Sequence, residues 1–277
     1  MKALFKNIAY RILPQSAIRS LKALHHKRTF NNFRIEQIPE FEVMSQLIPK
    51  DSVVLDIGAN IGLLAKCFSR LVGKGGLVYA LEPVPETFGI LNLNAKRVQD
   101  GNVIPLNIAA SNKDSTVKMV IPSYQSRHGV DIHGKVYEGS GDNFYEAKII
   151  SQHESSEEAN AKYVDVRTKT IDSLFSDSAG RISFIKCDVE GHELECFLGS
   201  LEILRSNHPA ILVEVMDDPF IPTGNAYRLF ELLKGEGYAP YYLHNGSITS
   251  FTESSGDINF FFLQPNHVAQ LGQFVRE

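Results

Sequence analysis

Residues 53–62 read VVLDIGANIG, a short apolar run that leads into an acid and two closely spaced glycines. The β-branched and aliphatic residues predict a buried strand, and apolar residues then repeat at helical spacing over residues 63–71. Gly58 has no Cβ, so the backbone can approach a ligand closely there, and Gly62 allows the helix to pack tightly on the strand. Nucleotide-type ligands bind at such strand-to-helix turns. The stretch therefore predicts the first strand of an α/β sheet with a cofactor site at its carboxyl end.

The spacing of the glycines separates two classes of cofactor. The dinucleotide fingerprint is G-x-G-x-x-G, whereas this chain has G-A-N-I-G and lacks the middle glycine that makes room for a pyrophosphate. Asp56, before the first glycine, suits a cofactor without phosphate, such as S-adenosylmethionine. The next expected strand ends in Glu82, and an acid at this point accepts hydrogen bonds from ribose hydroxyls in either class. An ordinary tight loop is the alternative interpretation of the glycine turn.

Strand and helix patterns alternate along most of the chain. This alternation predicts a mostly parallel sheet with helices on both faces. Two strands near the C-terminus, joined by a turn-rich link, predict an antiparallel pair at one sheet edge. The expected strands are residues 53–56, 77–81, 103–109, 182–188, 210–215, 239–243 and 258–263, and the expected helices are residues 63–71, 85–97, 171–176, 193–205 and 226–235.

The alternation is interrupted by an insert at residues 122–161, which is rich in Ser, Gly, His, Glu and Asn. The flanking residues 116–121 and 163–170 alternate like strands, so we expect a β-excursion with a long loop at its centre. Long loops in compact domains are usually functional or disordered. His128 and His133 are too loosely spaced to favour a metal site. The side chains with binding chemistry in the insert are Tyr124, Arg127, His128, Asp131, His133 and Tyr137.

Composition limits the class of protein. The chain has 277 residues, 43% of them hydrophobic, and a net charge of −4, which fits one large α/β domain and argues against a nucleic-acid partner. Cys67, Cys187 and Cys196 lie in apolar patterns and are expected to be reduced core residues of a cytoplasmic protein. No run approaches the roughly 18 apolar residues of a transmembrane helix. Lys6 and Arg11 interrupt the apolar start, so no signal peptide is expected.

The N-terminal segment differs in charge from the rest of the chain. Residues 1–35 contain Lys and Arg but no Asp or Glu. We expect residues 1–45 to form a basic helical extension and residues 46–277 to form the main domain. Basic amphipathic segments can lie on an anionic membrane surface, which predicts peripheral membrane contact. A helix that packs on the domain and exposes its charges to water is the alternative.

A second motif lies at residues 184–195, which read FIKCDVEGHELE. A buried strand leads into Asp188, and ionisable residues follow before a helix begins. Polar groups at the end of this strand would face the same crevice as the glycine turn, so we expect Asp188 to point toward the cofactor. Glu193 has a structural alternative as a helix cap, and His192 has one as a partner of neighbouring backbone.

These motifs together resemble the FkbM family of methyltransferases. The resemblance implies a Rossmann-like, seven-stranded class I methyltransferase fold, S-adenosylmethionine as the donor and most often a hydroxyl acceptor. The acceptors of the family vary, so the acceptor does not follow from the resemblance. The segments that carry it are DIGANIG at 56–62, LEP at 81–83, NIAAS at 107–111, TIDSL at 170–174, IKCDVEGHELE at 185–195 and ILVEV at 211–215.

The resemblance also implies roles for single residues. The turn after the first strand would hold the methionine end of the cofactor, Glu82 the ribose, and residues 109–111 the adenine side. The residues assigned to cofactor binding are Asp56, Gly58, Asn60, Gly62, Glu82, Ala109, Ala110 and Ser111. Those assigned to catalysis are Asp188, Glu190 and His192.

Methyl transfer requires the acceptor oxygen to be in line with the methyl group and freed of its proton. Asp188 or His192 is the expected base, and Glu214 at the end of the next strand can join Asp188. Alternatively, Asp188 and Glu214 hold a divalent cation that lowers the pKa of the hydroxyl. The polar insert and the basic N-terminus favour a saccharide acceptor, free or carried on a membrane lipid. The rival functions are a non-catalytic binding module, disfavoured by the intact acids, and a nicotinamide-dependent oxidoreductase, disfavoured by the missing glycine.

Overall fold

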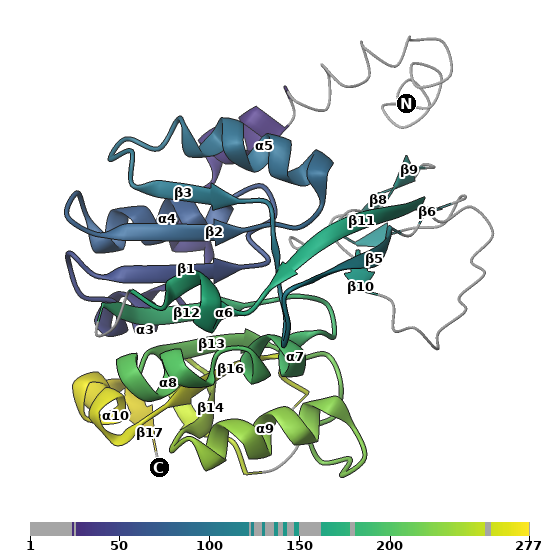
Figure 1. Ribbon diagram of the computed structural model, residues 1–277. Coiled ribbons are helices and arrows are strands. Elements are labelled where there is room, and N and C mark those ends of the chain that lie inside the picture. Colours follow the sequence, from purple (N-terminus) through teal and green to yellow (C-terminus); the bar gives the residue numbers. More distant parts are fainter. Residues whose placement is uncertain are drawn as a thin grey trace, which may run out of the picture.

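The computed structural model describes residues 26–121, 147–149, 162–177, 181–252 and 256–276, together with Leu24 and four short strands of the insert. Within these residues, a nine-stranded sheet forms the centre of the molecule, in the order β17-β15-β14-β16-β13-β12-β1-β2-β3 (Figure 1). Its strands are β1 (Val53–Ile57), β2 (Leu77–Leu81), β3 (Val103–Leu106), β12 (Ile182–Cys187), β13 (Ala210–Glu214), β14 (Ala239–His244), β15 (Ser247–Ser250), β16 (Asn259–Leu263) and β17 (Val275–Arg276).

The strand directions confirm the predicted mostly parallel α/β sheet. Strands β3, β2, β1, β12 and β13 run parallel to one another. Strand β16 runs antiparallel to both β13 and β14, so the predicted antiparallel pair is present but lies inside the sheet. Strands β15 and β17 extend the edge beyond the seven strands that were expected.

Strand β15 lies in the link that was expected to be only turn-rich. Asn245 and Gly246 both have positive φ, 48° and 76°. This conformation matches a two-residue type I′ turn, which joins antiparallel strands with the right twist. The turn places β14 and β15 side by side with His244 opposite Ser247. The Asn-Gly pair was the sequence signal for this hairpin.

Helices cover both faces of the sheet, as predicted. Alternate residues of β1 enter different cores: Val53, Leu55 and Ile57 pack with one set of helices, and Val54 packs with the other. The first set consists of α6 (Ile171–Phe175), α7 (Glu193–Leu198), α8 (Leu201–Asn207) and α9 (Asn225–Gly235). The second consists of α3 (Phe41–Leu47), α4 (Leu63–Val72), α5 (Pro85–Ala95) and α10 (Pro265–Leu271), with the short helices η1 (Ile35–Gln37) and η3 (Gly272–Phe274) beside it.

The N-terminal part of the described chain joins the second core. Val43, Met44 and Leu47 of α3 are buried. Helix α3 therefore crosses the expected boundary between residues 45 and 46, and the division into an extension and a main domain stays a prediction. None of the described helices is both long and apolar enough to cross a membrane.

Two predicted elements are divided in the structure. The strand expected at residues 103–109 ends at Leu106, because Asn107 turns the chain by donating its Nδ2 to the carbonyls of Glu82 and Pro83, both at 2.9 Å. The helix expected at residues 193–205 is two helices, α7 and α8. Gly199 separates them.

A second sheet stands at the carboxyl end of the central sheet (Figure 1). Its order is β10 (Lys148–Ile149), β5 (Ser115–Ile121), β11 (Lys162–Lys169) and β4 (Ala109–Ala110). Strands β5 and β11 pair antiparallel, which confirms the predicted β-excursion. The short strands β6 (Ser123–Tyr124), β7 (Gly129–Val130), β8 (Val136–Tyr137) and β9 (Gly141–Asp142) belong to the insert. The side chains of Tyr124, Arg127, His128, Asp131, His133 and Tyr137 lie outside the described residues.

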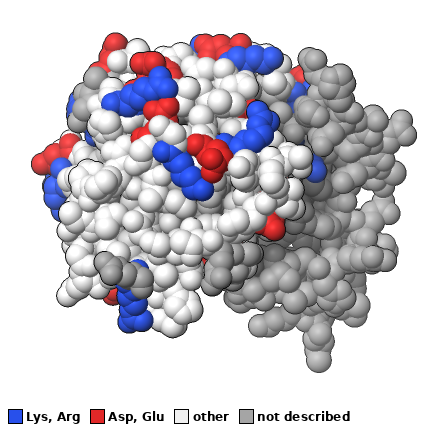
Figure 2. Space-filling view, turned by 90° about the horizontal axis from the view of Figure 1, so that it is seen from below, with Lys and Arg blue, Asp and Glu red and all other residues white. Residues whose placement is uncertain are grey.

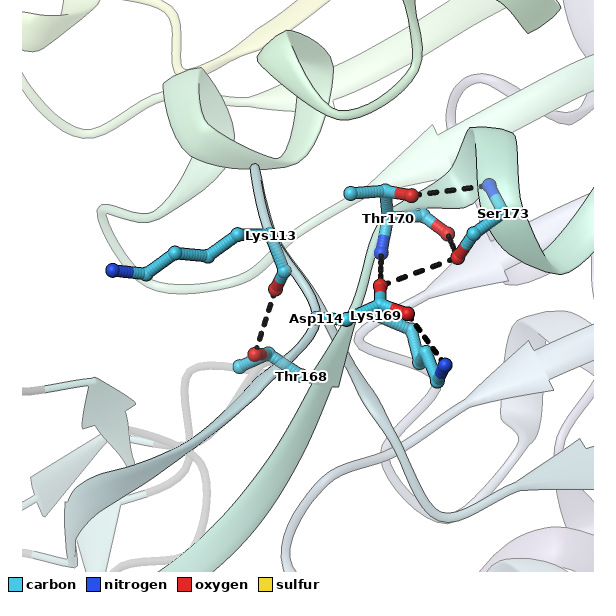
Figure 3. A network of polar contacts seen from close by, with 6 residues as sticks. All are labelled: Lys113, Asp114, Thr168, Lys169, Thr170 and Ser173. Carbon is cyan, nitrogen blue, oxygen red and sulfur yellow. Dashed lines mark hydrogen bonds and ion pairs between the residues drawn. The ribbon is translucent and has the colours of Figure 1, made fainter.

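Asp114 joins the second sheet to α6 (Figure 3). Its Oδ1 accepts hydrogen bonds from the Thr170 N–H at 3.0 Å and from the Ser173 hydroxyl at 3.2 Å. Its Oδ2 pairs with the Lys169 ammonium, and this contact lowers the pKa of the Asp114 carboxyl. Thr170 also caps α6 by accepting the Ser173 N–H. The end of β11 and the start of α6 are thereby fixed against the loop before β5.

The lower side of Figure 1, where α9 and α10 lie, carries charges of both signs (Figure 2). Arg205 of α8 pairs with Glu236 at 2.6 Å, and Lys234 pairs with Glu231 at 3.0 Å. The exposed Lys234 pair contributes little to stability, whereas the Glu236 side chain is only 16% exposed and accepts two hydrogen bonds from Arg205. Nucleic-acid binding requires clustered positive charge, and the mixed charges on this side do not provide it.

Replacing Gly199 by Ala should destabilise the fold. A Cβ at Gly199 would lie 2.1 Å from the Ser111 carbonyl oxygen, a main-chain atom that cannot move alone. Forced overpacking of this kind typically costs about 1–3 kcal/mol, measurable by urea unfolding. Gly235→Ala is the matched control, because nothing lies within 4 Å of its Cβ position. Equal stability of the two variants would contradict the assigned contact.

Candidate active site

Polar side chains gather at the carboxyl ends of three neighbouring strands. The register places Lys186 of β12 opposite Asp56 of β1. It also places Glu214 of β13 beside Asp188, which follows β12. Because side chains alternate between the two faces of a strand, all four lie on the same side of the sheet. Sequence motifs that are far apart in the chain therefore meet at one edge.

A pocket lies over these strand ends, between the central and the second sheet. Nine of its lining residues were expected from the sequence, and five of them come from the two motifs at residues 53–62 and 184–195. They are Gly58, Asn60, Glu82, Ala109, Ala110, Asp188, Glu190, His192 and Glu214. The remaining lining residues are Pro83, Val189 and an apolar group that sequence reasoning missed, Ile57, Val84, Ile108, Met119, Ala147 and Ile149.

Three residues expected to bind cofactor do not line the pocket. Asp56 is fully buried beneath it. Gly62 lies at the start of α4, where a Cβ would be 2.7 Å from Leu91 Cδ1, so its observed contact is with helix α5. Ser111 is buried and contacts His192. A direct contact of these residues with a cofactor stays a prediction.

The turn after β1 has a conformation that requires glycine. Gly58 has φ +76°, and a Cβ on it would lie 1.7 Å from the Asp188 carbonyl oxygen. The N–H groups of Gly58 and Ala59 donate to the Leu81 carbonyl at 3.0 and 2.9 Å. The turn is thus held closely between the ends of β2 and β12, which sets the floor of the pocket.

Glu82 holds the next part of the turn. Its Oε2 accepts the Asn60 N–H at 3.0 Å, and its Oε1 accepts the Val84 N–H at 2.9 Å. Burial raises the pKa of Glu82 to about 7, against the opposing effect of these two hydrogen bonds. Each carboxylate oxygen has two acceptor sites, so the side chain retains capacity for hydroxyl donors of a ligand in the pocket.

Lys186 is the functional residue that sequence reasoning missed. Its ammonium donates to the Asp188 Oδ2 at 3.0 Å and to the Gly58 carbonyl at 3.3 Å, and lies 4.0 Å from the Asp56 Oδ1. Burial alone would lower the pKa of Lys186, but the two carboxylates outweigh it and raise the pKa above its usual range. A lysine inside the apolar run ISFIKC was the available signal, because a buried charge requires partners.

Asp56 depends on that ammonium. Neither oxygen of its carboxylate has a hydrogen-bond partner among the described residues. Burial raises the pKa of Asp56 to about 6, and Lys186 opposes this rise while Asp188 adds to it. The ion pair with Lys186 is therefore the main interaction that favours the charged form of Asp56.

The loop after Asp188 is held by Glu193. Its Oε1 accepts the N–H groups of Gly191 at 3.0 Å and Val189 at 3.3 Å. Glu190 and Gly191 have positive φ, 55° and 90°, so the chain turns sharply there. These bonds go to N–H groups that precede α7, so the expected role of Glu193 as a helix cap stays a prediction. They leave Glu190 and His192 on the pocket side.

His192 has a side-chain partner on each ring nitrogen. Its Nε2 lies 3.0 Å from the Ser111 hydroxyl, and its Nδ1 lies 3.6 Å from Glu195 Oε2. Burial lowers the pKa of His192, and Glu195 opposes this shift. Both ring contacts are with side chains. The alternative interpretation from the sequence was that the His192 ring bonds only to neighbouring backbone.

The divalent-cation alternative has no support in the structure. In the described part of the chain, no group of three or more His, Cys, Asp or Glu side chains is placed to hold a metal ion. Asp188 is already bonded to the Lys186 ammonium. A cation at Asp188 and Glu214 would compete with that ammonium for the same carboxylate.

A family model matches most of the chain. The model of the methyltransferase FkbM domain matches residues 56–240, which is more than half of the chain. The curated protein hexuronic acid methyltransferase AglP of Haloferax volcanii is 29% identical over 167 residues. That match covers 60% of this chain and 56% of AglP, so the chain spans little more than half of this relative.

Solved structures of methyltransferases are also similar. Methyltransferase FkbM from Methylobacillus flagellatus KT is 15% identical, with 93% of this chain and 57% of that chain covered and a TM-score of 0.46. An S-adenosylmethionine-dependent methyltransferase from Aquifex aeolicus is 16% identical, with 87% and 96% covered and a TM-score of 0.42.

Replacing Lys186 by Met should destabilise the protein in a pH-dependent way. Removal of one member of a buried ion pair typically costs about 3–5 kcal/mol. Without the ammonium, the pKa of the buried Asp56 rises further above its unfolded value. Stability is then retained at low pH and lost as pH rises through the folded pKa. Urea unfolding from pH 5 to pH 8 should show the deficit growing with pH.

Lys118→Met is the matched control. Lys118 pairs with Asp165 at 2.9 Å, a similar distance, but both side chains are largely exposed. Its removal should change stability little at any pH. A Lys186→Met deficit that is small or independent of pH would show that the buried cluster does not support the fold.

Proposed function

The chain belongs to the FkbM methyltransferase family, as its motifs indicated, and on this premise we propose that it transfers a methyl group from S-adenosylmethionine to a hydroxyl of a saccharide. The observation that carries the proposal is the convergence of both motifs on one pocket. Glu82 lines that pocket together with Asp188, Glu190 and His192. A donor bound at the first motif would thus face the ionisable groups of the second.

The chemistry of the lining fits the donor. S-adenosylmethionine supplies an activated methyl group on a positively charged sulfonium. The Glu82 carboxylate can accept hydrogen bonds from a ribose diol. The apolar side chains of Val84, Ile108 and Met119 suit a flat base, and the carboxylates of Asp188 and Glu214 suit a positive charge. A nicotinamide dinucleotide would add two phosphates, which these acids disfavour.

The lining also supports a hydroxyl acceptor. The name of AglP indicates that this relative methylates a hexuronic acid, which supports a saccharide as the acceptor class. Among the described lining residues there is no Lys or Arg side chain to pair with an acceptor carboxylate. A neutral hydroxyl needs a base within hydrogen-bond reach, and the acids of the pocket offer one. No step of this proposal requires a metal ion.

Two measurements test the proposal on the full chain. Titration calorimetry should detect binding of S-adenosylmethionine and no binding of NAD. Labelled methyl groups should be transferred to members of a panel of neutral hexosides, hexuronides and lipid-linked saccharides. Methyl transfer only to hexuronide carboxyl groups would give methyl esters, and the proposed acceptor would then be a carboxylate and not a hydroxyl. Binding without any transfer would favour a non-catalytic module, and binding of NAD would favour an oxidoreductase.

Replacing Glu82 by Ala should weaken S-adenosylmethionine binding. Loss of a charged hydrogen bond typically costs about 1.5–3 kcal/mol, or roughly ten- to a hundredfold in affinity. Calorimetry on Glu82→Ala is compared with calorimetry on Glu86→Ala, because Glu86 is exposed on α5 outside the pocket. Glu86→Ala should bind S-adenosylmethionine as the unmodified protein does. Unchanged affinity in a folded Glu82→Ala protein would remove Glu82 from the cofactor site.

The basic N-terminus motivates a second expectation, peripheral binding to anionic membranes. Each Lys or Arg near such a surface contributes about 1 kcal/mol. Replacing Lys2, Lys6, Arg11 and Arg19 by Gln should reduce co-sedimentation with phosphatidylserine liposomes, most strongly at low salt, and leave cofactor affinity unchanged. Failure of the unmodified protein to co-sediment even at low salt would refute membrane contact.

A further inference from the structure

Asp188 and Glu214 are neighbouring carboxylates in one pocket with different partners. We propose that Glu214 takes the proton of the acceptor hydroxyl, and that Asp188, which Lys186 holds in place, orients the acceptor. This inference rests on the proposed methyl transfer and assigns its base. The expected bases were Asp188 and His192, so the assignment changes the role of both.

The strand register brings the two carboxylates together. Cys187 of β12 is paired with Val213 of β13, so the next residues of the two strands, Asp188 and Glu214, lie side by side. Both line the pocket. Either one could therefore reach a hydroxyl bound there, and the choice depends on what else each carboxylate contacts.

Asp188 is a poor proton acceptor because it already bonds a cation. Its Oδ2 accepts a hydrogen bond from the Lys186 ammonium at 3.0 Å. Protonation of Asp188 would leave that buried ammonium with the Gly58 carbonyl and with Asp56 at 4.0 Å. An uncompensated buried charge is strongly unfavourable. The ion pair thus makes Asp188 the less available of the two carboxylates.

Glu214 has no such restraint. Its carboxylate makes no hydrogen bond or ion pair within the described part of the chain, and it is only partly buried. The charged groups that face it are Asp188 after β12, Glu193 of α7 and Glu40 before α3, with Lys186 of β12 opposing them. Proton uptake by Glu214 relieves repulsion among these carboxylates.

The same surroundings adjust the acidity of Glu214. Burial is the main cause that raises the pKa of Glu214 to about 7, and the charge of Asp188 adds to it. A base is most effective when its pKa is close to the working pH. Glu214 is then sufficiently ionised to accept a proton and basic enough to hold it.

His192 is the less suitable base because its Nε2 is already within hydrogen-bond distance of the Ser111 hydroxyl. A neutral imidazole has one donor nitrogen and one acceptor nitrogen. Ser111 contacts one of them and Glu195 lies near the other. His192 instead connects the segment before β5 to the loop after β12, which makes it a positioning residue for the pocket.

The reaction step balances with Glu214 as the base. The acceptor oxygen forms a bond to the methyl carbon, and its proton passes to the Glu214 carboxylate. The bond from sulfur to methyl breaks, and its electron pair stays on sulfur, which becomes an uncharged thioether. The product is a methyl ether, and the proton is later released from Glu214 to solvent.

The pH dependence of turnover tests the assignment. With a hexoside that accepts methyl in the panel, wild-type kcat/KM, which reports the free enzyme, should rise with pH around a midpoint near 7. In Glu214→Gln, kcat should fall about 10²–10⁴-fold and this rise should disappear. In Asp188→Asn, kcat should fall while the rise remains. Asp217→Asn, an exposed residue outside the pocket, should behave as wild type.

A titration that needs no acceptor supports the kinetic test. In full-length protein with ¹³C-labelled Glu carboxyls, the Glu214 signal is the one absent from Glu214→Gln. Its midpoint should lie near neutrality and should fall in Asp188→Asn, because a neighbouring negative charge is removed and Lys186 loses its partner. A midpoint below pH 5 would overturn the assignment.

The outcomes separate this inference from the proposed function. A Glu214→Gln protein that keeps the pH-dependent rise, or a rate within a few-fold of wild type, overturns only the base. S-adenosylmethionine binding that remains detectable by calorimetry in Glu214→Gln shows that the site is intact, with an affinity lowered by the loss of one carboxylate. A wild-type protein that binds no S-adenosylmethionine overturns the proposed function, and the assignment of the base with it.

Discussion

One buried ammonium connects the parts on which the pocket depends. Lys186 bonds Asp188 and the Gly58 carbonyl, and it compensates the otherwise unpartnered carboxylate of Asp56. The two motifs of the sequence are more than a hundred residues apart, and this contact joins the ends of their strands. An ion pair in such surroundings fixes geometry more than it adds stability. Here the ion pair holds the turn after β1 and the carboxylate after β12 at a fixed distance from each other.

The pocket is completed by the second sheet. Met119 of β5 and Ile149 of β10 supply part of its apolar wall, although neither belongs to the central sheet. Two connections hold that sheet in place, the Asp114 network at α6 and the contact between Ser111 and His192 (Figure 3). The apolar wall and the ionisable floor therefore come from different layers of the fold, and their relative position is set by these polar contacts.

The acids that line the pocket differ in their surroundings. The pKa values of Glu82 and Glu214 are both raised to about 7, mainly by burial. Asp188 differs because the Lys186 ammonium contacts it directly. A positively charged ligand would favour the ionised forms of both glutamates. One pocket thus contains two acids whose pKa values lie near neutrality and a third acid that is bonded to a lysine.

The sequence by itself determined the α/β class, the alternation of strands and helices that gives a mostly parallel sheet, and most of the pocket's ionisable residues. It could do so because strand ends and glycine turns are encoded locally. It did not predict the break at Gly199, which depends on the distant Ser111 carbonyl. Nor did it predict the role of Lys186 or the difference between Asp188 and Glu214. These follow from which strands are neighbours, because burial and opposite charge act only when residues distant in the chain are brought together. The tertiary structure alone decided them.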